Sequence, residues 1–164
     1  RPDQLRIAYR VKGVLGYGNF SVVHEGEHIF DNRVVALKTY NKAQMKDKLE
    51  VLPLHYPGIE LVKNEIRNLH HLKPYHISPL IEVFETIDAV VLVQHKADAG
   101  DMMNFLKKQS HCYGEELIKG IIFKILEKVA VLHMIGTALG NLGYIHRDLK
   151  PANILVDAIK HQPV

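Results

Sequence analysis

The N-terminal part of the chain alternates between short apolar segments and turn residues, and this pattern constrains the fold more than any other feature of the sequence. Residues 9–15 alternate in polarity, and residues 20–26 follow after a glycine-containing turn. An Asp-Asn pair then precedes a third apolar segment, 33–39. Short alternating segments bounded by turn residues are typical of strands. The pattern therefore predicts three strands in an antiparallel meander.

The next part of the chain adds one helix and two strands. Residues 41–58 are polar and broken by two prolines, which favours a loop with some helix. Residues 59–72 carry apolar side chains at helical spacing. Two further strands are predicted at 80–85 and 89–93. Residues 1–96 are thus expected to form a five-stranded antiparallel sheet with one helix after the third strand.

Residues 97–164 are expected to be mainly helical. Asp101 is placed to cap a short helix that runs to Leu106, because an aspartate accepts hydrogen bonds from the free N–H groups of a first turn. Residues 115–134 hold one apolar stripe at helical spacing. A glycine-containing break, a polar loop and a short buried strand then follow at 136–143, 144–153 and 154–156. The whole chain therefore predicts an α+β fold in two parts.

Composition excludes several classes of protein. The chain has 164 residues, 47% of them hydrophobic and 24% charged, with a net charge of +3. The basic residues are scattered, so neither a nucleic acid nor a membrane surface is indicated as a partner. No apolar run approaches the roughly 18 residues of a membrane span. Cys112 is the only cysteine, which favours a reducing compartment such as the cytosol or the nucleus.

The predicted hairpin carries Gly16 and Gly18, and Lys38 follows it by one strand and a turn. Glycines let the backbone approach phosphate oxygens and offer them N–H donors, and Lys38 could reach phosphates held there. Such a hairpin is more often only a tight turn, and such a lysine more often extends to solvent. A dinucleotide-binding fold is excluded, because a strand follows the glycines where that fold needs a helix.

An acid on the predicted helix 59–72 could hold Lys38 in position. Glu65 and Glu60 are the two candidates, and both could equally lie on a solvated helix face. The sequence alone leaves this choice open.

The polar loop 144–153 concentrates reactive side chains between apolar anchors. The carboxylate of Asp148 can accept a proton from a hydroxyl, and Lys150 can neutralise charge on a transferring phosphoryl group. Asn153 supplies a hard oxygen ligand suited to Mg²⁺. This mixture of side chains indicates a catalytic loop.

The set resembles the eukaryotic protein kinase family. Residues 146–153, His-Arg-Asp-Leu-Lys-Pro-Ala-Asn, are similar to the family's catalytic loop position by position. Lys150, two residues after Asp148, is similar to the serine/threonine branch. The resemblance implies a two-lobe kinase-like fold with ATP between the lobes: an ATP-binding N-terminal lobe at 1–96 and a partial helical C-terminal lobe at 97–164.

The resemblance also implies a role for each matching residue. Gly16 and Gly18 would cover the phosphates, while Lys38 would hold them and Glu65 would anchor Lys38. Asp148 would orient and deprotonate the substrate hydroxyl, Lys150 would assist it, and Asn153 would hold one Mg²⁺. The remaining residues implied to contact ATP are Leu15, Val23, Ala36, Gln94, Ala97, Asp101 and Leu155.

Four features depart from the family pattern. Ser21 stands at the third glycine of the hairpin motif. Residues 49–57 lengthen the connection between Lys38 and Glu65, and 137–143 look inserted before the catalytic loop. No Asp-Phe-Gly or Ala-Pro-Glu follows within the sequence, so the resemblance implies that these residues alone transfer no phosphoryl group.

Two hypotheses remain. The chain is the N-terminal part of an active serine/threonine kinase domain that uses ATP and Mg²⁺ to phosphorylate protein hydroxyls. Alternatively, it is a pseudokinase or truncated module that binds nucleotide as a scaffold. The sequence beyond Val164 would separate them.

Overall fold

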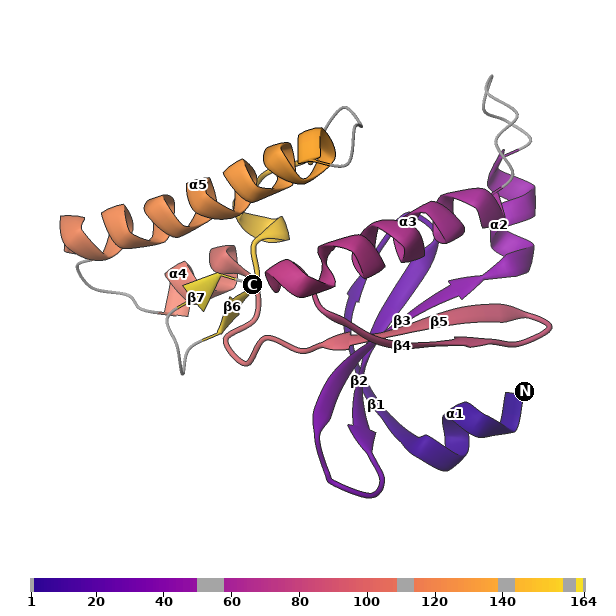
Figure 1. The fold of residues 1–164 in the computed structure, drawn as a ribbon. Coiled ribbons are helices and arrows are strands. Elements are labelled where there is room, and N and C mark those ends of the chain that lie inside the picture. The colour runs from indigo at the N-terminus through magenta and orange to yellow at the C-terminus, as the bar shows by residue number, and fades with distance from the viewer. Residues whose placement is uncertain (1, 50–57, 109–113, 139–143, 158–161, 164) are drawn as a thin grey trace. The chain divides into compact units, whose positions relative to one another are not determined.

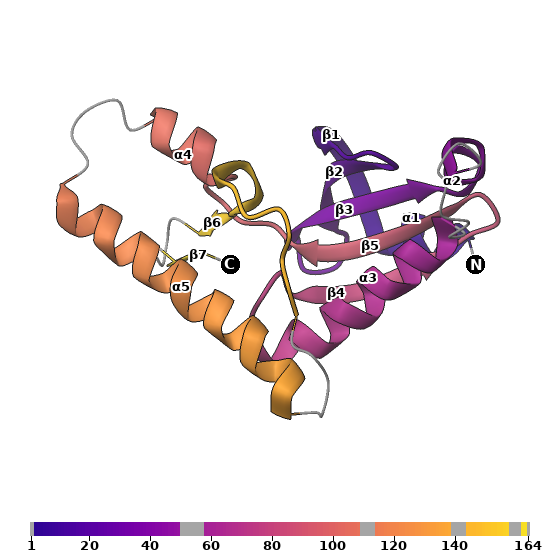
Figure 2. The same cartoon turned by 90° about the horizontal axis from the view of Figure 1, so that it is seen from above.

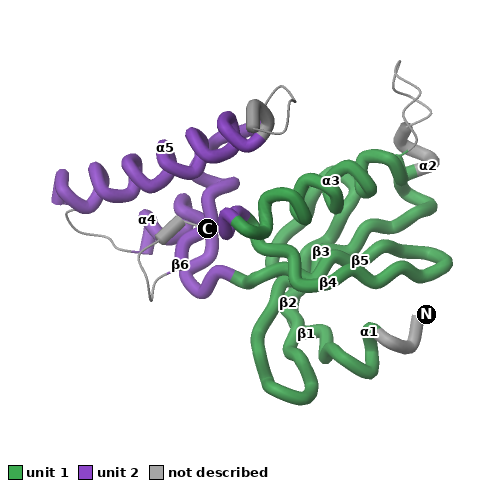
Figure 3. The backbone as a smooth tube through the Cα atoms, viewed as in Figure 1, with its two compact units in different colours: residues 1–74, 78–96 green, residues 75–77, 97–164 purple. Residues whose placement is uncertain are grey.

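The computed structural model describes residues 2–49, 58–108, 114–138, 144–157 and 162–163 (Figure 1). The chain divides into two compact units, one formed by residues 1–74 and 78–96 and the other by residues 75–77 and 97–164 (Figure 3). Each unit has a core of its own.

The first unit is built on a five-stranded sheet in the order β1-β2-β3-β5-β4, with every neighbouring pair antiparallel. The predicted α+β architecture and the meander of the first three strands are confirmed. The fifth strand, however, pairs with β3, and the fourth lies at the edge. The strands are β1 (Tyr9–Tyr17), β2 (Ser21–His28), β3 (Val34–Asn41), β4 (Leu80–Glu85) and β5 (Ala89–His95).

Helices lie on both faces of this sheet. The predicted helix is confirmed as α3 (Gly58–Leu72), and a 3-10 turn, η1 (Lys73–Tyr75), follows it at Pro74. The stretch expected to be a loop with some helix contains α2 (Lys42–Leu49). The sequence did not predict α1 (Pro2–Ala8), which lies on the face of the sheet opposite to α3 (Figures 1 and 2).

Alternation along β3 divides the core between the two faces. Val35 and Leu37 face α1 and pack with Tyr9 and Val93, against which Leu5 and Ala8 of the helix also pack. Ala36 and Lys38 alternate with them in sequence and point to the other face. On that face the α3 core joins residues of the helix to those of the sheet: Tyr40, Met45, Val62, Leu69, Leu80, Val90 and Leu92. The candidate site residues of β3 therefore lie on the α3 face.

The second unit is mainly helical, as predicted. Met102, Phe105, Ile121 and Val156 form its buried core. Among the described residues, none of the helices combines the length and the apolar character that crossing a bilayer requires. The elements of this unit are α4 (Met102–Lys108), α5 (Glu115–Ala138), η2 (Pro151–Asn153), β6 (Val156–Asp157) and β7 (Gln162–Pro163).

Two sequence-based boundaries need correction in this unit. The break predicted at 136–143 begins later, because α5 continues to Ala138 through residues that are compatible with a helix. The strand predicted at 154–156 begins only at Val156, since Leu155 takes part in a single isolated bridge. Most of the two segments interpreted as insertions, 50–57 and 139–143, lies outside the described residues, as does Cys112.

Candidate active site

The two glycines of the β1–β2 hairpin, Gly16 and Gly18, have different surroundings. The Gly18 N–H donates to the Ser21 carbonyl oxygen at 2.8 Å, and a Cβ atom added to Gly18 would lie 2.6 Å from Ser21 Oγ. The packing of the hairpin therefore favours a glycine at 18. A Cβ added to Gly16 would meet nothing within 4 Å, and Gly16 is not among the residues with positive φ. Neither local space nor a positive φ demands a glycine at 16, where the pairing of β1 with β2 is irregular.

Four of the expected nucleotide-contacting residues share one face of the sheet. Val23 of β2 is paired with Lys38 of β3, and Ala36 of β3 is paired with Gln94 of β5. Directly opposite residues of antiparallel strands project to the same side, as do residues two apart on one strand. Leu15 lies on β1, where its side chain is exposed. Small and apolar side chains thus flank Lys38 on the sheet.

Lys38 forms an ion pair with Glu65 of α3. The ammonium nitrogen of Lys38 lies 2.8 Å from Oε1 of Glu65, and the two side chains are 28% and 30% exposed. The competing acid, Glu60, pairs instead with Lys63 on its own helix at 2.7 Å. Of the two acids that the sequence left open, Glu65 is the one that the fold places beside Lys38.

Tyr40 completes this group, and sequence reasoning missed it. Its hydroxyl donates to Oε2 of Glu65, and its ring centroid lies 5.2 Å from the Lys38 ammonium nitrogen. Burial of the ring, reinforced by the charge of Glu65 and the hydrogen bond to it, raises the pKa of Tyr40. The hydroxyl therefore remains a protonated donor at neutral pH. The one signal in the sequence was the position of Tyr40, two residues after Lys38 on the same face of a strand.

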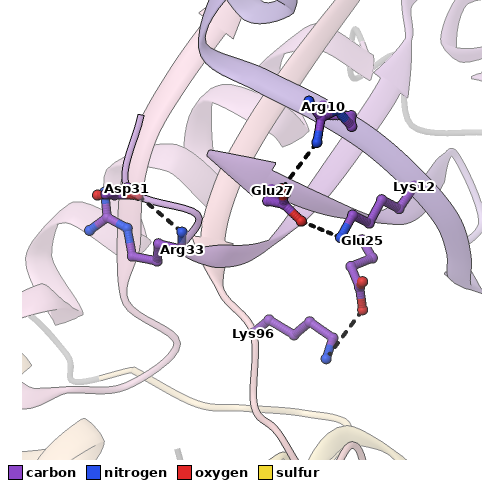
Figure 4. Close-up of polar contacts among 7 residues, drawn as sticks. All are labelled: Arg10, Lys12, Glu25, Glu27, Asp31, Arg33 and Lys96. Carbon is purple, nitrogen blue, oxygen red and sulfur yellow. Dashed lines mark hydrogen bonds and ion pairs between the residues drawn. The ribbon is translucent and has the colours of Figure 1, made fainter. Parts of the chain in front are cut away.

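Other charged residues of the first unit pair with one another (Figure 4). Arg10 and Lys12 both reach the carboxylate of Glu27. The Lys96 ammonium lies 3.4 Å from a carboxylate oxygen of Glu25, which ties the residue after β5 to β2. Surface pairs of this kind typically contribute about 0–1 kcal/mol to stability.

In the second unit the fold brings Asp101 and Leu155 together. They form an isolated antiparallel bridge, and the N–H of Val156 donates to the Gly100 carbonyl oxygen at 2.8 Å. Gly100 has a φ of 76°, a conformation that favours glycine, in the turn that follows the buried Ala97. Asp101 also caps α4 as predicted, because its Oδ1 accepts the N–H of Asn104 at 2.8 Å.

The start of the predicted catalytic loop is hydrogen-bonded to α5, and the loop contains a residue in a strained backbone conformation. The Tyr144 N–H donates to the Leu132 carbonyl oxygen at 3.0 Å, which ties the start of the loop to the helix. Arg147 has a φ of 65°, in the left-handed region, where a residue with a Cβ atom is destabilised by about 1 kcal/mol. The next N–H, that of Asp148, donates to the His146 ring at 3.3 Å. Backbone strain of this kind concentrates at functional sites.

Asp148 lies at the centre of a compact polar cluster. Its Oδ2 accepts from the Lys150 ammonium at 2.9 Å and from the Asn153 amide nitrogen at 2.7 Å. Lys150 first, and Asn153 next, hold the pKa of Asp148 below its ordinary value. The carboxylate is thus ionised at neutral pH and accessible to solvent, as an acceptor for a substrate hydroxyl must be.

The same hydrogen bonds orient the Asn153 amide. Both partners of its nitrogen are oxygens of Asp148 that act as acceptors, so the amide must direct its NH₂ group at them. This orientation leaves the amide oxygen of Asn153 outside both hydrogen bonds, and such an oxygen is a hard ligand that suits Mg²⁺. Among the described residues, no three His, Cys, Asp or Glu side chains lie close enough to share a metal.

Comparison with known proteins agrees with this chemistry. A family profile described as the protein kinase domain matches residues 9–163. The chain is 32% identical, over 90% of its length, to a calcium/calmodulin-dependent protein kinase type I of Schizosaccharomyces pombe, of which it covers 39%. It is 31% identical to a serine/threonine-protein kinase H1 homolog of Pinctada fucata, with 90% of the chain and 30% of the relative covered.

A third relative is NUAK family SNF1-like kinase 1 of Mus musculus, which is 28% identical over 93% of the chain and is covered to 21%. The chain thus spans between about a fifth and two fifths of the length of these relatives. The profile extends over both units and includes the hairpin, Lys38, Glu65 and the Asp148 cluster. The resemblance seen in the sequence is therefore confirmed: the chain belongs to the protein kinase domain family.

Proposed function

We propose that the protein carrying this chain transfers the γ-phosphoryl group of ATP to serine or threonine hydroxyls of other proteins. The observation that carries the proposal is the Asp148 cluster, in which an ionised carboxylate lies within hydrogen-bonding distance of Lys150 and Asn153. An acceptor, a cation and a hard oxygen ligand in one loop are the groups that phosphoryl transfer requires.

The first unit supplies the groups for the nucleotide. Lys38, held by Glu65, presents its ammonium for the phosphates, while the open backbone at Gly16 lets the hairpin approach them. Val23 and Ala36 share the face of Lys38 and offer apolar contact to the adenine ring. Leu15, Gly18 and Gln94 of this unit, and Ala97, Asp101 and Leu155 of the second, complete the proposed nucleotide contacts.

The second unit supplies the groups for the acceptor. Asp148 accepts the hydrogen of the substrate hydroxyl and orients its oxygen for attack. Because Lys150 and Asn153 lower its pKa, Asp148 acts mainly by orientation, which suffices in a loose transition state that needs little help from a base. Lys150 neutralises charge that the phosphoryl group carries. Mg²⁺, when bound, would neutralise phosphate oxygens, and Asn153 would be one of its ligands.

The proposed serine/threonine acceptor and the proposed cellular compartment rest on the sequence and on the named relatives. Lys150 at its place in the loop is similar to the serine/threonine branch, and the relative of Pinctada fucata is named a serine/threonine-protein kinase. A single cysteine, which leaves no internal disulfide, suits the cytosol or the nucleus.

The test uses the full-length protein that carries these residues, ATP labelled on the γ-phosphate and a mixture of unstructured protein substrates. We expect label on serine and threonine, and its loss in Lys38→Met and Asp148→Asn. Phosphotyrosine as the main product would contradict the proposed acceptor. Nucleotide binding without transfer would favour a scaffold, and absence of nucleotide binding would overturn the proposal.

A further inference from the structure

We propose that Tyr40 is a positioning residue for the Lys38–Glu65 pair, and that Ser21 connects it to the glycine hairpin. The inference rests on the proposed function, since it concerns the lysine that would hold the nucleotide phosphates. Tyr40 acts through Glu65 and Lys38 and touches neither substrate nor cofactor.

The geometry divides the Glu65 carboxylate between two donors from one strand. Oε1 of Glu65 lies 2.8 Å from the Lys38 ammonium nitrogen, and Oε2 accepts the Tyr40 hydroxyl. Lys38 and Tyr40 are two residues apart on β3 and project to the same face. A flexible ammonium alone could pair with either oxygen in many geometries. The second donor removes this freedom and fixes the carboxylate relative to β3.

Tyr40 is itself rigidly placed. It is only 7% exposed and packs in the α3-face core beside Val62 and Leu69. Its ring also lies 5.2 Å from the Lys38 ammonium nitrogen, within the range of a cation–π contact. Tyr40 thus contacts both members of the ion pair, one through its hydroxyl and the other through its ring.

Ser21 extends this arrangement to the hairpin. Ser21 is paired with Tyr40 across β2 and β3, is 7% exposed, and hydrogen-bonds the Tyr40 side chain. Its carbonyl oxygen accepts the Gly18 N–H at 2.8 Å. A glycine at position 21 would have no hydroxyl to offer. The departure from the family's third glycine therefore adds a polar link between the hairpin and Tyr40, which in turn contacts Glu65.

The experiment follows the reactivity of Lys38 in the full-length protein that carries these residues. The probe is an acyl phosphate of ATP, which acylates a lysine placed at its phosphates, and acylation of Lys38 is timed by mass spectrometry. Tyr40→Phe keeps the ring and removes the hydroxyl. We expect it to slow Lys38 acylation about tenfold, the scale of a lost hydrogen bond to a charged group.

Tyr9→Phe is the matched control. Tyr9 is also buried, and its hydroxyl also donates to a carboxylate, that of Glu82, but it lies in the core that faces α1. Tyr9→Phe should lower stability to a similar extent and leave Lys38 acylation within about twofold. Equal effects of the two variants would assign Tyr40 a role in stability alone and overturn the inference.

A double-mutant cycle separates positioning from packing. In a Glu65→Ala background, Tyr40→Phe should slow acylation no further, because the carboxylate that it orients is gone. A full additional effect there would overturn the inference. Ser21→Ala should slow acylation in the same direction as Tyr40→Phe, and an unchanged rate would remove Ser21 from the arrangement. If unmodified protein is not acylated at Lys38 at all, the proposed function fails, and this inference fails with it.

Discussion

The amide nitrogen of Asn153 donates to both the main-chain oxygen and the carboxylate of Asp148, at 2.9 and 2.7 Å. One side chain thereby fixes the direction of the Asp148 carboxylate and presents its own oxygen away from it. The proposed acceptor for a substrate hydroxyl and the proposed metal ligand are therefore oriented by the same contact.

Replacement of Asp148 by asparagine should abolish phosphoryl transfer and spare nucleotide binding. The asparagine introduced at 148 carries no negative charge with which to accept the substrate hydrogen. Its NH₂ group would also face that of Asn153, and two donors cannot hydrogen-bond to each other. We expect the rate to fall by about 10²–10⁴-fold, measured as initial rates in the full-length protein with a nucleotide affinity determined in parallel.

Asp31→Asn is the control for this change. Asp31 is a loop aspartate whose exposure, 52%, is close to the 61% of Asp148, and hydrogen bonds lower its pKa as well. It should retain full activity. A rate for Asp148→Asn within tenfold of the unmodified protein would remove Asp148 from the reaction.

Neutralising the two acids of α3 should have unequal effects. Glu65→Gln removes the charge that faces Lys38 and should weaken ATP affinity by roughly tenfold. Glu60→Gln removes the charge that faces Lys63 on the helix surface, and its effect should remain within about twofold. Titration calorimetry with ATP measures both, and equal affinities for the two variants would contradict the assignment of Glu65.

Replacing each of the two hairpin glycines by alanine should distinguish an effect on stability from an effect on nucleotide binding. Gly18→Ala places a methyl group 2.6 Å from Ser21 Oγ and should lower the free energy of unfolding by about 1–3 kcal/mol. Gly16→Ala meets nothing within 4 Å, so stability should change by less than about 0.5 kcal/mol while nucleotide affinity falls. Urea unfolding and calorimetry provide the two measurements.

Ser21→Gly in the Gly18→Ala background removes the atom that the new methyl group meets, and should restore part of the lost stability. Unchanged nucleotide affinity in Gly16→Ala would show that no ligand approaches the backbone there.

Stability should fall steeply on the alkaline side. Burial first, and hydrogen bonding to a carboxylate as well, raise the pKa of Tyr9 and Tyr40 above the ordinary value of 10.0. Above pH 10 the unfolded chain releases these protons while the folded chain keeps them, so the free energy of unfolding decreases as pH rises. Their stabilising contribution is complete below pH 10 and is lost above it.

Chemical unfolding measured between pH 8 and about 11 tests this sign. Tyr9→Phe and Tyr40→Phe should each flatten the alkaline slope. Tyr17→Phe serves as the control, because its side chain is 81% exposed and meets solvent in both states. A slope that neither buried variant changes would contradict the expectation.

Local sequence patterns predicted most of the helices and strands but not which of them lie side by side. The bounds of β4 agree with the prediction, and α3 begins one residue earlier, at Gly58, because alternation and helical spacing are properties of consecutive residues. That β5 lies next to β3, with β4 at the edge, depends on which surfaces meet after α3 has packed, which no window of sequence contains. The helix α1 was missed for the same reason: it is short, and its burial comes from strands far along the chain.

The sequence by itself determined the protein family and indicated the candidate catalytic residues, because the family motifs require particular side chains at fixed spacing within one loop, 146–153, and one hairpin. Only the tertiary structure decided which acid pairs with Lys38. Glu60 and Glu65 lie on the same helix, and the packing of that helix places Glu65 beside Lys38 and Glu60 beside Lys63. The tertiary structure also revealed Tyr40, whose hydroxyl matters because β3 and α3 bring it to Glu65. The spacing of residues along the chain indicates the chemistry of a motif. Contacts between residues of different helices and strands depend instead on how the whole unit packs.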